Sequence, residues 1–390
     1  MQDVLVIGAG AFGLTAAIEL RRRGCRVTVV DPGPVPGARQ ASADLNKAVR
    51  MEYGADRQYL EMVDRSIDGW EAWNARFGVN VYEPTGVLML AGPAMADGGF
   101  EFESLRAVGA VGHTPERLSG VALVERFAAW RPGQYAEGFY HARGGYTRSA
   151  LTVEKLAGYA RELGVAVRIG DPAARLVDRA GRVAGAALAS GEEVGADHTV
   201  VAAGVWTTRL VPELGPMMRA TAHPIFYLRP RDPAAYRPPR FCVFCADVAN
   251  TGWYGFPVDD GTGLLKLAKH DAGDPVDPDA ERGGVSATRV DELRAFLRSS
   301  LPGLVDAELV DAKRCFYSDT LDGHFVIDRH PERAGLTVAT GGSGHAMKMA
   351  PVLGGLIADA VEGASNDWLG RFAWRTQASS VPGDAARATS

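Results

Sequence analysis

Cysteine is scarce in this sequence and follows no repeated spacing. The 390 residues contain only Cys25, Cys242, Cys245 and Cys315, which excludes a small scaffold held together by disulfides. Cys242 and Cys245 form a single C-x-x-C pair, which suits a metal or redox site or plain packing. No second pair completes four zinc ligands, and residues three apart on a strand point to opposite faces. Packing is favoured, and we expect no metal site.

Long hydrophobic runs and an excess of basic charge are also missing. The apolar run from Val4 to Leu20 is broken by Gly8, Gly10 and Gly13, so it is typical of a strand, a turn and a helix rather than a membrane span. No basic segment precedes it, as one would in an export signal. A net charge of −5 and a pI near 6.0 argue against nucleic-acid binding. We expect a cytoplasmic protein with neither a nucleic-acid nor a membrane partner.

The sequence instead shows segments of α/β pattern that are interrupted by segments consisting mainly of predicted strands. Residues 1–31 predict a strand, a helix and a second strand, and 57–77 predict an amphipathic helix. Residues 150–169 predict another helix and strand, followed by a hairpin or meander. Further elements are expected as strands at 80–91, an irregular stretch at 92–101, alternating strands at 217–315 with a helix near 290–300, and a strand, glycine loop and helix at 336–362, the helix itself at 348–361.

This arrangement predicts two interleaved domains and a tail. We expect an α/β fold with a discontinuous Rossmann-type nucleotide domain and a substrate domain built on a mixed or antiparallel sheet. The predicted boundaries are 1–84, 141–216 and 318–376 for the nucleotide domain, 85–140 and 217–317 for the substrate domain, and 377–390 for a mobile tail.

The motif Gly8-Ala9-Gly10-Ala11-Phe12-Gly13 has the G-x-G-x-x-G spacing of a dinucleotide site and stands between the first strand and its helix. Gly8 permits the tight turn, Gly10 lets the backbone approach a pyrophosphate, and Gly13 lets the helix pack on the strand. The free N–H groups of the helix N-terminus favour an anion. Asp31 ends the second strand, where it can accept hydrogen bonds from a ribose. The scattered nucleotide segments favour FAD over NAD.

Seven short motifs, in order and spacing, then resemble one protein family. They are GAGAFG at 8–13, DLNKAVRMEYG at 44–54, VVAAGVW at 200–206, WYGFP at 253–257, LLKLAKH at 264–270, RCFYSDTLDGHFVID at 314–328 and GGSGHAMKM at 341–349. The chain resembles the D-amino-acid-oxidase-like flavoproteins, and most closely their monomeric sarcosine oxidase and N-methyltryptophan oxidase branch. The resemblance implies a glutathione-reductase-type FAD domain and a monomer.

The resemblance also implies roles for individual residues. Cys315 would be joined to the flavin through a thioether, although a buried packing cysteine is the common fate of such a residue. Lys266 lies on an alternating strand, where it is either an exposed edge lysine or a buried one beside the flavin that promotes the reaction with oxygen. Arg50 and Lys348 would hold a substrate carboxylate.

The remaining expected site residues follow the same motifs. Tyr254, His270 and Tyr317 would line the substrate cavity, and His345 at a helix entrance would stabilise negative charge on the flavin. The full set that we expect to bind FAD is Gly8, Gly10, Ala11, Phe12, Gly13, Asp31, Ser42, Lys47, Val167, Ala203, Gly204, Trp206, Cys315, Gly342, Gly344, His345 and Lys348.

One departure leaves the substrate open. The sequence Asp44-Leu45-Asn46-Lys47 is more similar to that of oxidases that deglycate fructosyl amino acids, in which a lysine at this position approaches the flavin.

The function that the resemblance implies is oxidation of an N-substituted α-amino acid to an imine, with oxygen reduced to hydrogen peroxide. A fructosyl-amino-acid oxidase and a flavin dehydrogenase that passes electrons to a partner are the alternatives. A non-enzymatic or tRNA-modifying flavin subunit and an NAD-dependent dehydrogenase are disfavoured.

Overall fold

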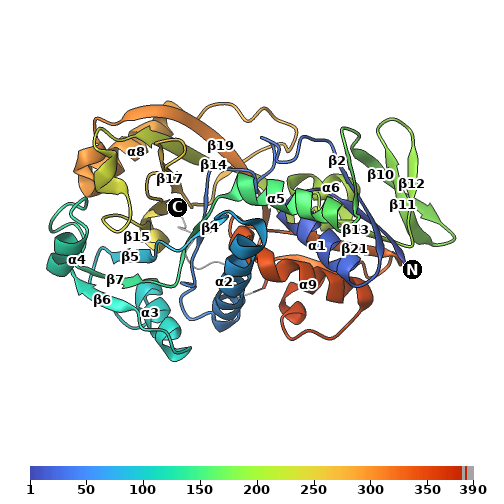
Figure 1. The fold of residues 1–390 in the computed structure, drawn as a ribbon, viewed down its shortest axis with the longest axis horizontal. Coiled ribbons are helices and arrows are strands. Elements are labelled where there is room, and N and C mark those ends of the chain that lie inside the picture. The colour runs from blue at the N-terminus through green and yellow to red at the C-terminus, as the bar shows by residue number, and fades with distance from the viewer. Residues whose placement is uncertain (380–382, 384–390) are drawn as a thin grey trace.

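The computed structural model describes residues 1–379 and residue 383, and these form two lobes, each built on one sheet (Figure 1). The fold class predicted from the sequence, α/β with a Rossmann-type sheet beside a mixed sheet, is confirmed. The predicted tail at 377–390 falls largely outside the described residues. None of the helices in the described part of the chain is long and apolar enough to cross a membrane.

The lobe that contains the N-terminus has a six-stranded sheet. Its strands, in spatial order, are β20 (Val326–Arg329), β21 (Leu336–Thr340), β13 (His198–Val201), β1 (Asp3–Ile7), β2 (Arg26–Asp31) and β9 (Ala166–Ile169). All neighbours are parallel except β20 and β21. A three-stranded meander of β10 (Ala173–Arg179), β11 (Arg182–Leu188) and β12 (Glu193–Gly195) follows β9. Three separate stretches of sequence thus build one sheet.

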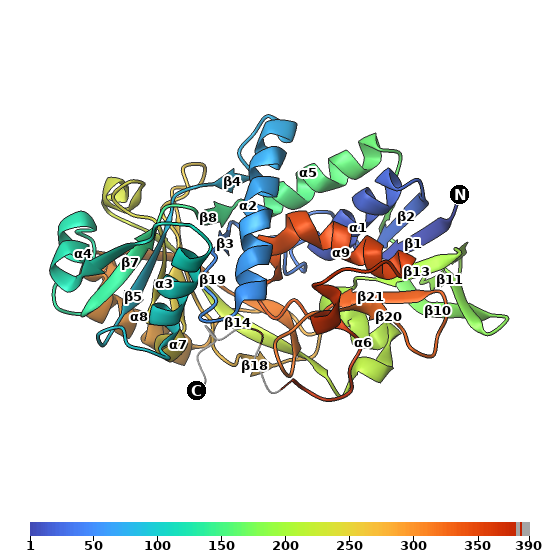
Figure 2. The same ribbon diagram turned by 90° about the horizontal axis from the view of Figure 1, so that it is seen from below.

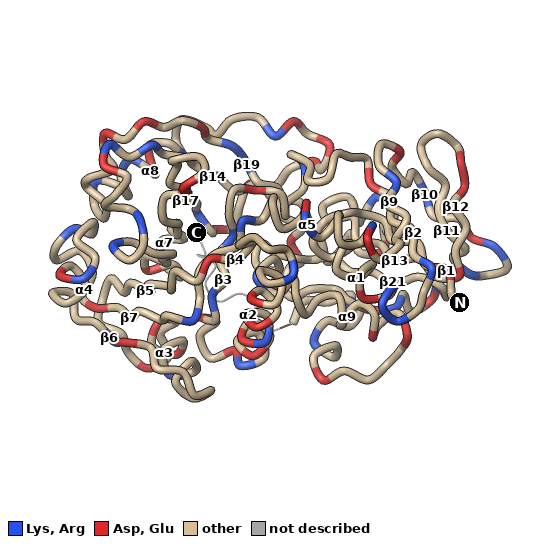
Figure 3. Tube along the Cα trace, in the orientation of Figure 1, with Lys and Arg blue, Asp and Glu red and all other residues tan. Residues whose placement is uncertain are grey.

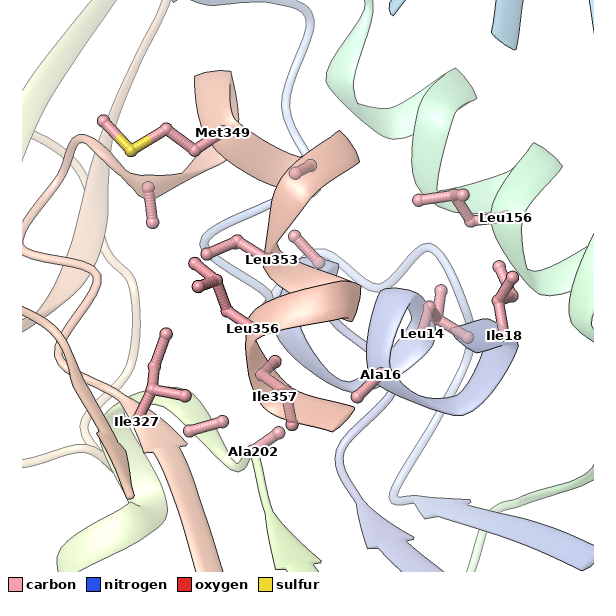
Figure 4. Close-up of a cluster of buried hydrophobic side chains, with 14 of the residues drawn as sticks. Leu14, Ala16, Ile18, Leu156, Ala202, Ile327, Met349, Leu353, Leu356 and Ile357 are labelled. Atoms are coloured by element: carbon pink, nitrogen blue, oxygen red, sulfur yellow. The ribbon is translucent and has the colours of Figure 1, made fainter. Parts of the chain in front are cut away.

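The helices on this sheet pack through small and aliphatic side chains. They are α1 (Ala11–Arg22), α5 (Ser149–Glu162) and α9 (Ala350–Glu362), with α2 (Arg57–Phe77) against α9. Figure 4 shows side chains of α1, α5 and α9 meeting those of the sheet, among them Leu14, Leu156, Leu353 and Ile327. Residue 354 of α9 is glycine, and a Cβ there would lie 2.5 Å from the carbonyl oxygen of Thr15 in α1. The two helices therefore approach too closely for a side chain.

The second lobe has a nine-stranded sheet that is mostly antiparallel. Its strands are β18 (Asp274–Pro275), β14 (Met218–Arg229), β17 (Leu265–Lys269), β16 (Trp253–Gly255), β15 (Val243–Ala246), β5 (Val87–Ala91), β7 (Glu137–His141) and β6 (Glu116–Ser119), with β19 (Glu308–Thr320) paired to β14. The helices of this lobe are α3 (Phe100–Ala110), α4 (Gly120–Arg126), α7 (Val248–Thr251) and α8 (Ala287–Ser300). Figure 2 shows α3, α4 and α8 gathered around this sheet.

The long strand β14 and a small three-stranded sheet join the lobes. Met218 of β14 belongs to the core beside the six-stranded sheet, whereas Phe226 and Leu228 belong to the core of the nine-stranded one. The small sheet consists of β3 (Lys47–Val49), β8 (Gly145–Thr147) and β4 (Tyr82–Glu83). The remaining short helices are α6 (Thr207–Leu210), η1 (Gly204–Trp206), η2 (Pro212–Leu214), η3 (Pro233–Tyr236), η4 (Pro302–Leu304), η5 (Ala346–Met349) and η6 (Leu369–Phe372).

Most predicted elements match, and the differences have local causes. The helix predicted at 57–77 is α2, capped by the Asp56 carboxylate and ended by Gly78 in the left-handed conformation. The stretch expected to be irregular up to Glu101 already contains the start of α3. The helix expected to begin at Lys348 begins at Ala350, because Pro351 favours a helix start and Lys348 lies in η5. Figure 3 shows acidic and basic residues interspersed along the trace.

Two neighbouring glycines of α9 test the close helix contact. Gly354→Ala should lower the free energy of unfolding by about 1–3 kcal/mol, because its methyl group has no room against α1. Gly355→Ala is the control, since a Cβ there meets nothing within 4 Å and alanine is the better helix former by up to about 1 kcal/mol. Urea unfolding followed by circular dichroism measures both. Equal stability of the two variants would contradict the contact.

Candidate functional site

In the turn from β1 to α1, two of the motif glycines are required by close contacts with the protein's own backbone. Gly8 adopts φ +110° and donates its N–H to the carbonyl of Val30 at 2.8 Å. A Cβ on Gly8 would lie 2.3 Å from the carbonyl oxygen of Ala202, and one on Gly13 would lie 1.8 Å from the carbonyl oxygen of Gly8. Any side chain at either position would therefore push the strand, the turn and the helix apart.

The third glycine of the motif leaves space for a ligand. A Cβ on Gly10 would meet only the Ser42 hydroxyl, at 3.3 Å. Gly10 is also the N-cap of α1, and no side chain caps that helix. Gly342 lies against the ring of Phe12, which brings the 341–349 loop to the same helix end. The N-terminus of α1, with Ala11 in its first turn, thus fits a phosphate.

Asp31 holds the same turn from the end of β2. Its carboxylate accepts the N–H of Ala9 at 2.8 Å and that of Gly33 at 2.9 Å, and burial raises the pKa of the Asp31 carboxyl. The sequence predicted only a ribose contact for this residue. The other predicted cofactor residues of the sheet lie on β9, where Val167 pairs with β2, and directly after β13, at Ala203, Gly204 and Trp206. A ligand site at the carboxyl ends of parallel strands is the rule for such sheets.

Where the lobes meet, a narrow cavity of about 50 Å³ collects four of the six predicted catalytic residues, namely Arg50, Tyr254, His270 and Lys348. The whole lining set is Lys47, Ala48, Arg50, Cys245, Val248, Tyr254, His270, Gly344, His345, Met347 and Lys348. Tyr317 lies directly behind this wall, since a Cβ on Gly344 would lie 2.3 Å from its ring. Lys266, the sixth, does not line the cavity.

Two cations of this cavity meet at Tyr53, a residue that the sequence did not single out. The guanidinium of Arg50 lies 5.1 Å from the centre of the Tyr53 ring, and Lys348 Nζ lies 3.0 Å from the Tyr53 hydroxyl. The same hydroxyl lies 2.9 Å from Nδ1 of His345. Arg50 and Lys348 are each 5% exposed. The indole N–H of Trp70 in α2 donates to the backbone carbonyl of Lys348 at 2.8 Å, which fixes the backbone of Lys348 to that helix.

Lys266 is fully buried, so the interpretation as an exposed edge lysine is wrong. Its ammonium donates to Oδ2 of Asp44 and to the carbonyl of Asn46, both at 2.6 Å, and lies 4.8 Å from the centre of the Phe256 ring. Burial lowers the pKa of Lys266 to about 8, and Asp44 opposes that shift. The sequence had drawn attention to the segment that contains Asp44, but not to Asp44 as a partner of Lys266.

Lys47 connects this ion pair with Cys315. Lys47 Nζ lies 3.2 Å from Oδ2 of Asp44 and 3.7 Å from Sγ of Cys315, which stands half-buried on β19. Burial opposes the charge of Lys47, but Cys315 and Asp44 outweigh it and raise the pKa of the ammonium. Lys47 thus places a fixed positive charge directly beside the sulfur of Cys315.

The C-x-x-C pair shows no such setting. Cys242 and Cys245 are free and buried, and they belong to the cores on opposite sides of the nine-stranded sheet. Burial raises the pKa of the Cys245 thiol to about 12. Within the described residues, no three His, Cys, Asp or Glu side chains are grouped so that they could hold a metal ion. Packing accounts for both cysteines.

The hydroxyl of Tyr53 is testable apart from any reaction. Tyr53→Phe should lower the free energy of unfolding by about 1–3 kcal/mol, because buried Lys348 and His345 both lose a partner. Tyr82→Phe is the matched control, since the Tyr82 hydroxyl is buried and has no hydrogen-bond partner in the described chain. We expect that control to change stability by less than about 0.5 kcal/mol. Similar losses in both variants, by urea unfolding, would contradict the assignment.

Several known proteins are similar to this chain, in sequence or in fold, along nearly its whole length. N-methyl-L-tryptophan oxidase from Salmonella arizonae is 30% identical over 361 residues, which cover 92% of this chain and 94% of that protein. Monomeric sarcosine oxidase from a Bacillus species is 27% identical over 363 residues, which cover 91% and 90%. Both are relatives to which this chain is similar throughout.

Among solved structures, fructosyl amine:oxygen oxidoreductase (Amadoriase I) from Aspergillus fumigatus superposes with a TM-score of 0.82 at 24% identity, covering 96% of this chain and 90% of that one. A cysteine-pair mutant of Amadoriase I gives 26% identity at the same coverage and TM-score. The family described as FAD dependent oxidoreductase matches residues 3–360. That match covers both lobes and the turn that fits a dinucleotide, and it shows that this chain belongs to the FAD dependent oxidoreductase family.

Proposed function

We propose that this protein is an FAD-dependent amine oxidase that converts an N-substituted α-amino acid to its imine and reduces oxygen to hydrogen peroxide. The observation that carries the proposal is the buried pair of Arg50 and Lys348 in one cavity. A guanidinium grips a carboxylate through two parallel hydrogen bonds, and an ammonium adds a point charge. The relatives named for N-methyltryptophan and sarcosine, both N-methyl amino acids, support the same substrate class.

The cofactor fits residues already described. Its pyrophosphate would lie at the N-terminus of α1, over Gly10, and Cys315, whose Sγ lies 3.7 Å from Lys47 Nζ, would hold the ring covalently. Bound FAD supplies a hydride acceptor. The protein supplies the position of the substrate: Arg50 and Lys348 fix the carboxylate, so that the C–H next to nitrogen is presented in one orientation.

The positive charge of the cavity also favours the reactive, neutral form of the substrate amine. None of the described residues that line the cavity is acidic, whereas three are lysine or arginine. Nearby positive charge lowers the pKa of a bound amine and favours its neutral form, whose lone pair assists loss of hydride from the adjacent carbon. The substrate thus loses two electrons and two protons and becomes an imine, which water hydrolyses after release. Lys266 would stabilise the negative charge that develops on oxygen.

A fructosyl amino acid is the second candidate substrate. Lys47, which ends the Asp44-Leu45-Asn46-Lys47 segment, lines the cavity, and a mutant of Amadoriase I is 26% identical over 96% of this chain. Both candidates share the amine oxidation and differ in the group on nitrogen. Transfer of electrons to a partner protein rather than to oxygen is the remaining alternative. We expect a monomer in the cytoplasm.

Anaerobic bleaching of the flavin absorbance separates the substrate classes. The purified protein is mixed with sarcosine, N-methyltryptophan, pipecolate, proline, a D-amino acid and a fructosyl amino acid in turn. We expect bleaching by an N-methyl or cyclic secondary amino acid, and faster bleaching at about pH 9 than at about pH 7, because the neutral amine reacts. Bleaching only by the fructosyl compound would select the second candidate. A yellow protein that none of these bleaches would refute the substrate class.

Covalent attachment has a direct test of its own. After acid precipitation, the wild-type protein should keep its yellow colour in the pellet, whereas Cys315→Ala should release the flavin into the supernatant. Cys245→Ala is the control, since this second free cysteine lines the cavity and burial raises its thiol pKa to about 12. Release of flavin from the wild type, or retention by the Cys315 variant, would show that Cys315 forms no bond to FAD.

A further inference from the structure

Asp44 faces a second cavity that shares no lining residue with the first. This cavity has a volume of about 410 Å³ and lies between the 44–45 segment, the start of α5, the loop before β17, and strands β14 and β19. Its lining residues are Asp44, Leu45, Arg148, Ala150, Leu151, Tyr227, Asp259, Thr262, Leu264, Asp311 and Lys313. Asp44 is therefore next to a space that is separate, in its lining residues, from the substrate cavity.

The two oxygens of the Asp44 carboxylate have different partners. Oδ2 faces the interior, where it accepts from Lys266 at 2.6 Å and lies 3.2 Å from Lys47 Nζ. Oδ1 accepts from the Tyr227 hydroxyl and lies 3.6 Å from Nζ of Lys313, a side chain that is 43% exposed. Burial would raise the pKa of Asp44, but Lys266, Lys47 and Lys313 hold it well below the usual range. Asp44 is thus ionised throughout the neutral range.

Lys266 needs this partner to stay charged. Desolvation can lower the pKa of a buried lysine to about 5–6, at which the amine is neutral at pH 7. The titratable groups that act on Lys266 are Asp44 and Cys315, which raise its pKa, and Lys47, which lowers it. Asp44 makes the direct contact, and it is the larger of the two favourable influences.

We propose that Asp44 is the positioning residue that keeps Lys266 protonated and fixed, so that the reaction with oxygen proceeds at neutral pH. The inference rests on the proposed function, in which the Lys266 ammonium stabilises negative charge on oxygen. Asp44 does not itself line the substrate cavity and has no described contact with Arg50 or Lys348, and its one described contact in that cavity is Lys47, at 3.2 Å. Its removal should therefore slow the oxygen reaction, in which Lys266 acts directly, more than amine oxidation, which it reaches only through Lys47.

The experiment measures the two half-reactions separately across pH in the holoenzyme. In the wild type, reoxidation of dithionite-reduced flavin by oxygen should be constant at low pH and fall as pH rises through the Lys266 pKa of about 8. In Asp44→Asn the fall should move to lower pH, so that reoxidation at pH 7.5 is about 10-fold slower and recovers toward pH 6. Anaerobic bleaching by substrate should change less than reoxidation and should not show the same shift with pH.

Three further variants make the test specific. Asp44→Glu keeps the charge and should restore most of the wild-type profile. Lys266→Met should react about 100-fold more slowly at every pH, and adding Asp44→Asn to it should change nothing further. Asp311→Asn removes an exposed acid from the same cavity and should match the wild type.

A second readout protects the test if Asp44→Asn fails to fold. Lys313→Met removes a half-exposed cation that lies 3.6 Å from Oδ1 of Asp44, so it acts on Lys266 only through Asp44: the carboxylate is left to Lys266 and Lys47, and the fall should move upward. The midpoint potential of the flavin should change slope with pH at the same point as the rate, because it reports the charge of Lys266 independently of oxygen. If the pH at which the rate falls and the slope of the potential changes is the same in Asp44→Asn and Lys313→Met as in the wild type, Asp44 does not have this role. A wild type that oxygen does not reoxidise, with a potential that still reports Lys266, would refute the oxidase function alone.

Discussion

The burial of positive charge is the constraint on which the centre of this structure depends. Lys47, Arg50, Lys266 and Lys348 all lie between the lobes, and Lys266 is wholly removed from solvent. An isolated buried ammonium costs several kcal/mol and gives up its proton unless partners compensate. Two groups provide these partners. The Asp44 carboxylate forms ion pairs with Lys47 and Lys266. The ring of Tyr53 lies against the guanidinium of Arg50, and its hydroxyl accepts a hydrogen bond from Lys348.

Both compensating groups and two of the cations, Lys47 and Arg50, come from one short segment, and the rest of the fold brings the other two to it. Asp44 and Tyr53 flank β3, which is held between the lobes by its pairing with β8. Lys266 arrives on β17 of the nine-stranded sheet, and Lys348 arrives in η5 ahead of α9. The close packing of α9 on α1, which requires glycine at position 354, therefore also sets where Lys348 meets Tyr53.

The local parts of this architecture could be predicted from sequence because their causes are local. The G-x-G-x-x-G turn and the 3.6-residue period of α2 are carried by neighbouring residues, and both elements lie where expected. Lys266 shows the limit: alternation places it on one strand face but does not say whether that face is covered. Its partner Asp44 is 222 residues away, and Tyr53 is 295 residues from Lys348. Such pairings follow from the tertiary fold and leave no periodic signal.

The Asp44 carboxylate also links two cavities that are otherwise separate. Lys47 lines the cavity of Arg50 and Lys348, whereas Asp44 lines the one behind Lys266, and the two side chains lie 3.2 Å apart. Over that distance in a buried site, a change of charge on one side is felt strongly on the other. A substrate that brings its own carboxylate into the first cavity adds a negative charge to the cation cluster. Under the proposed function, that charge would favour the protonated form of Lys266, so substrate binding and the reaction with oxygen would support each other.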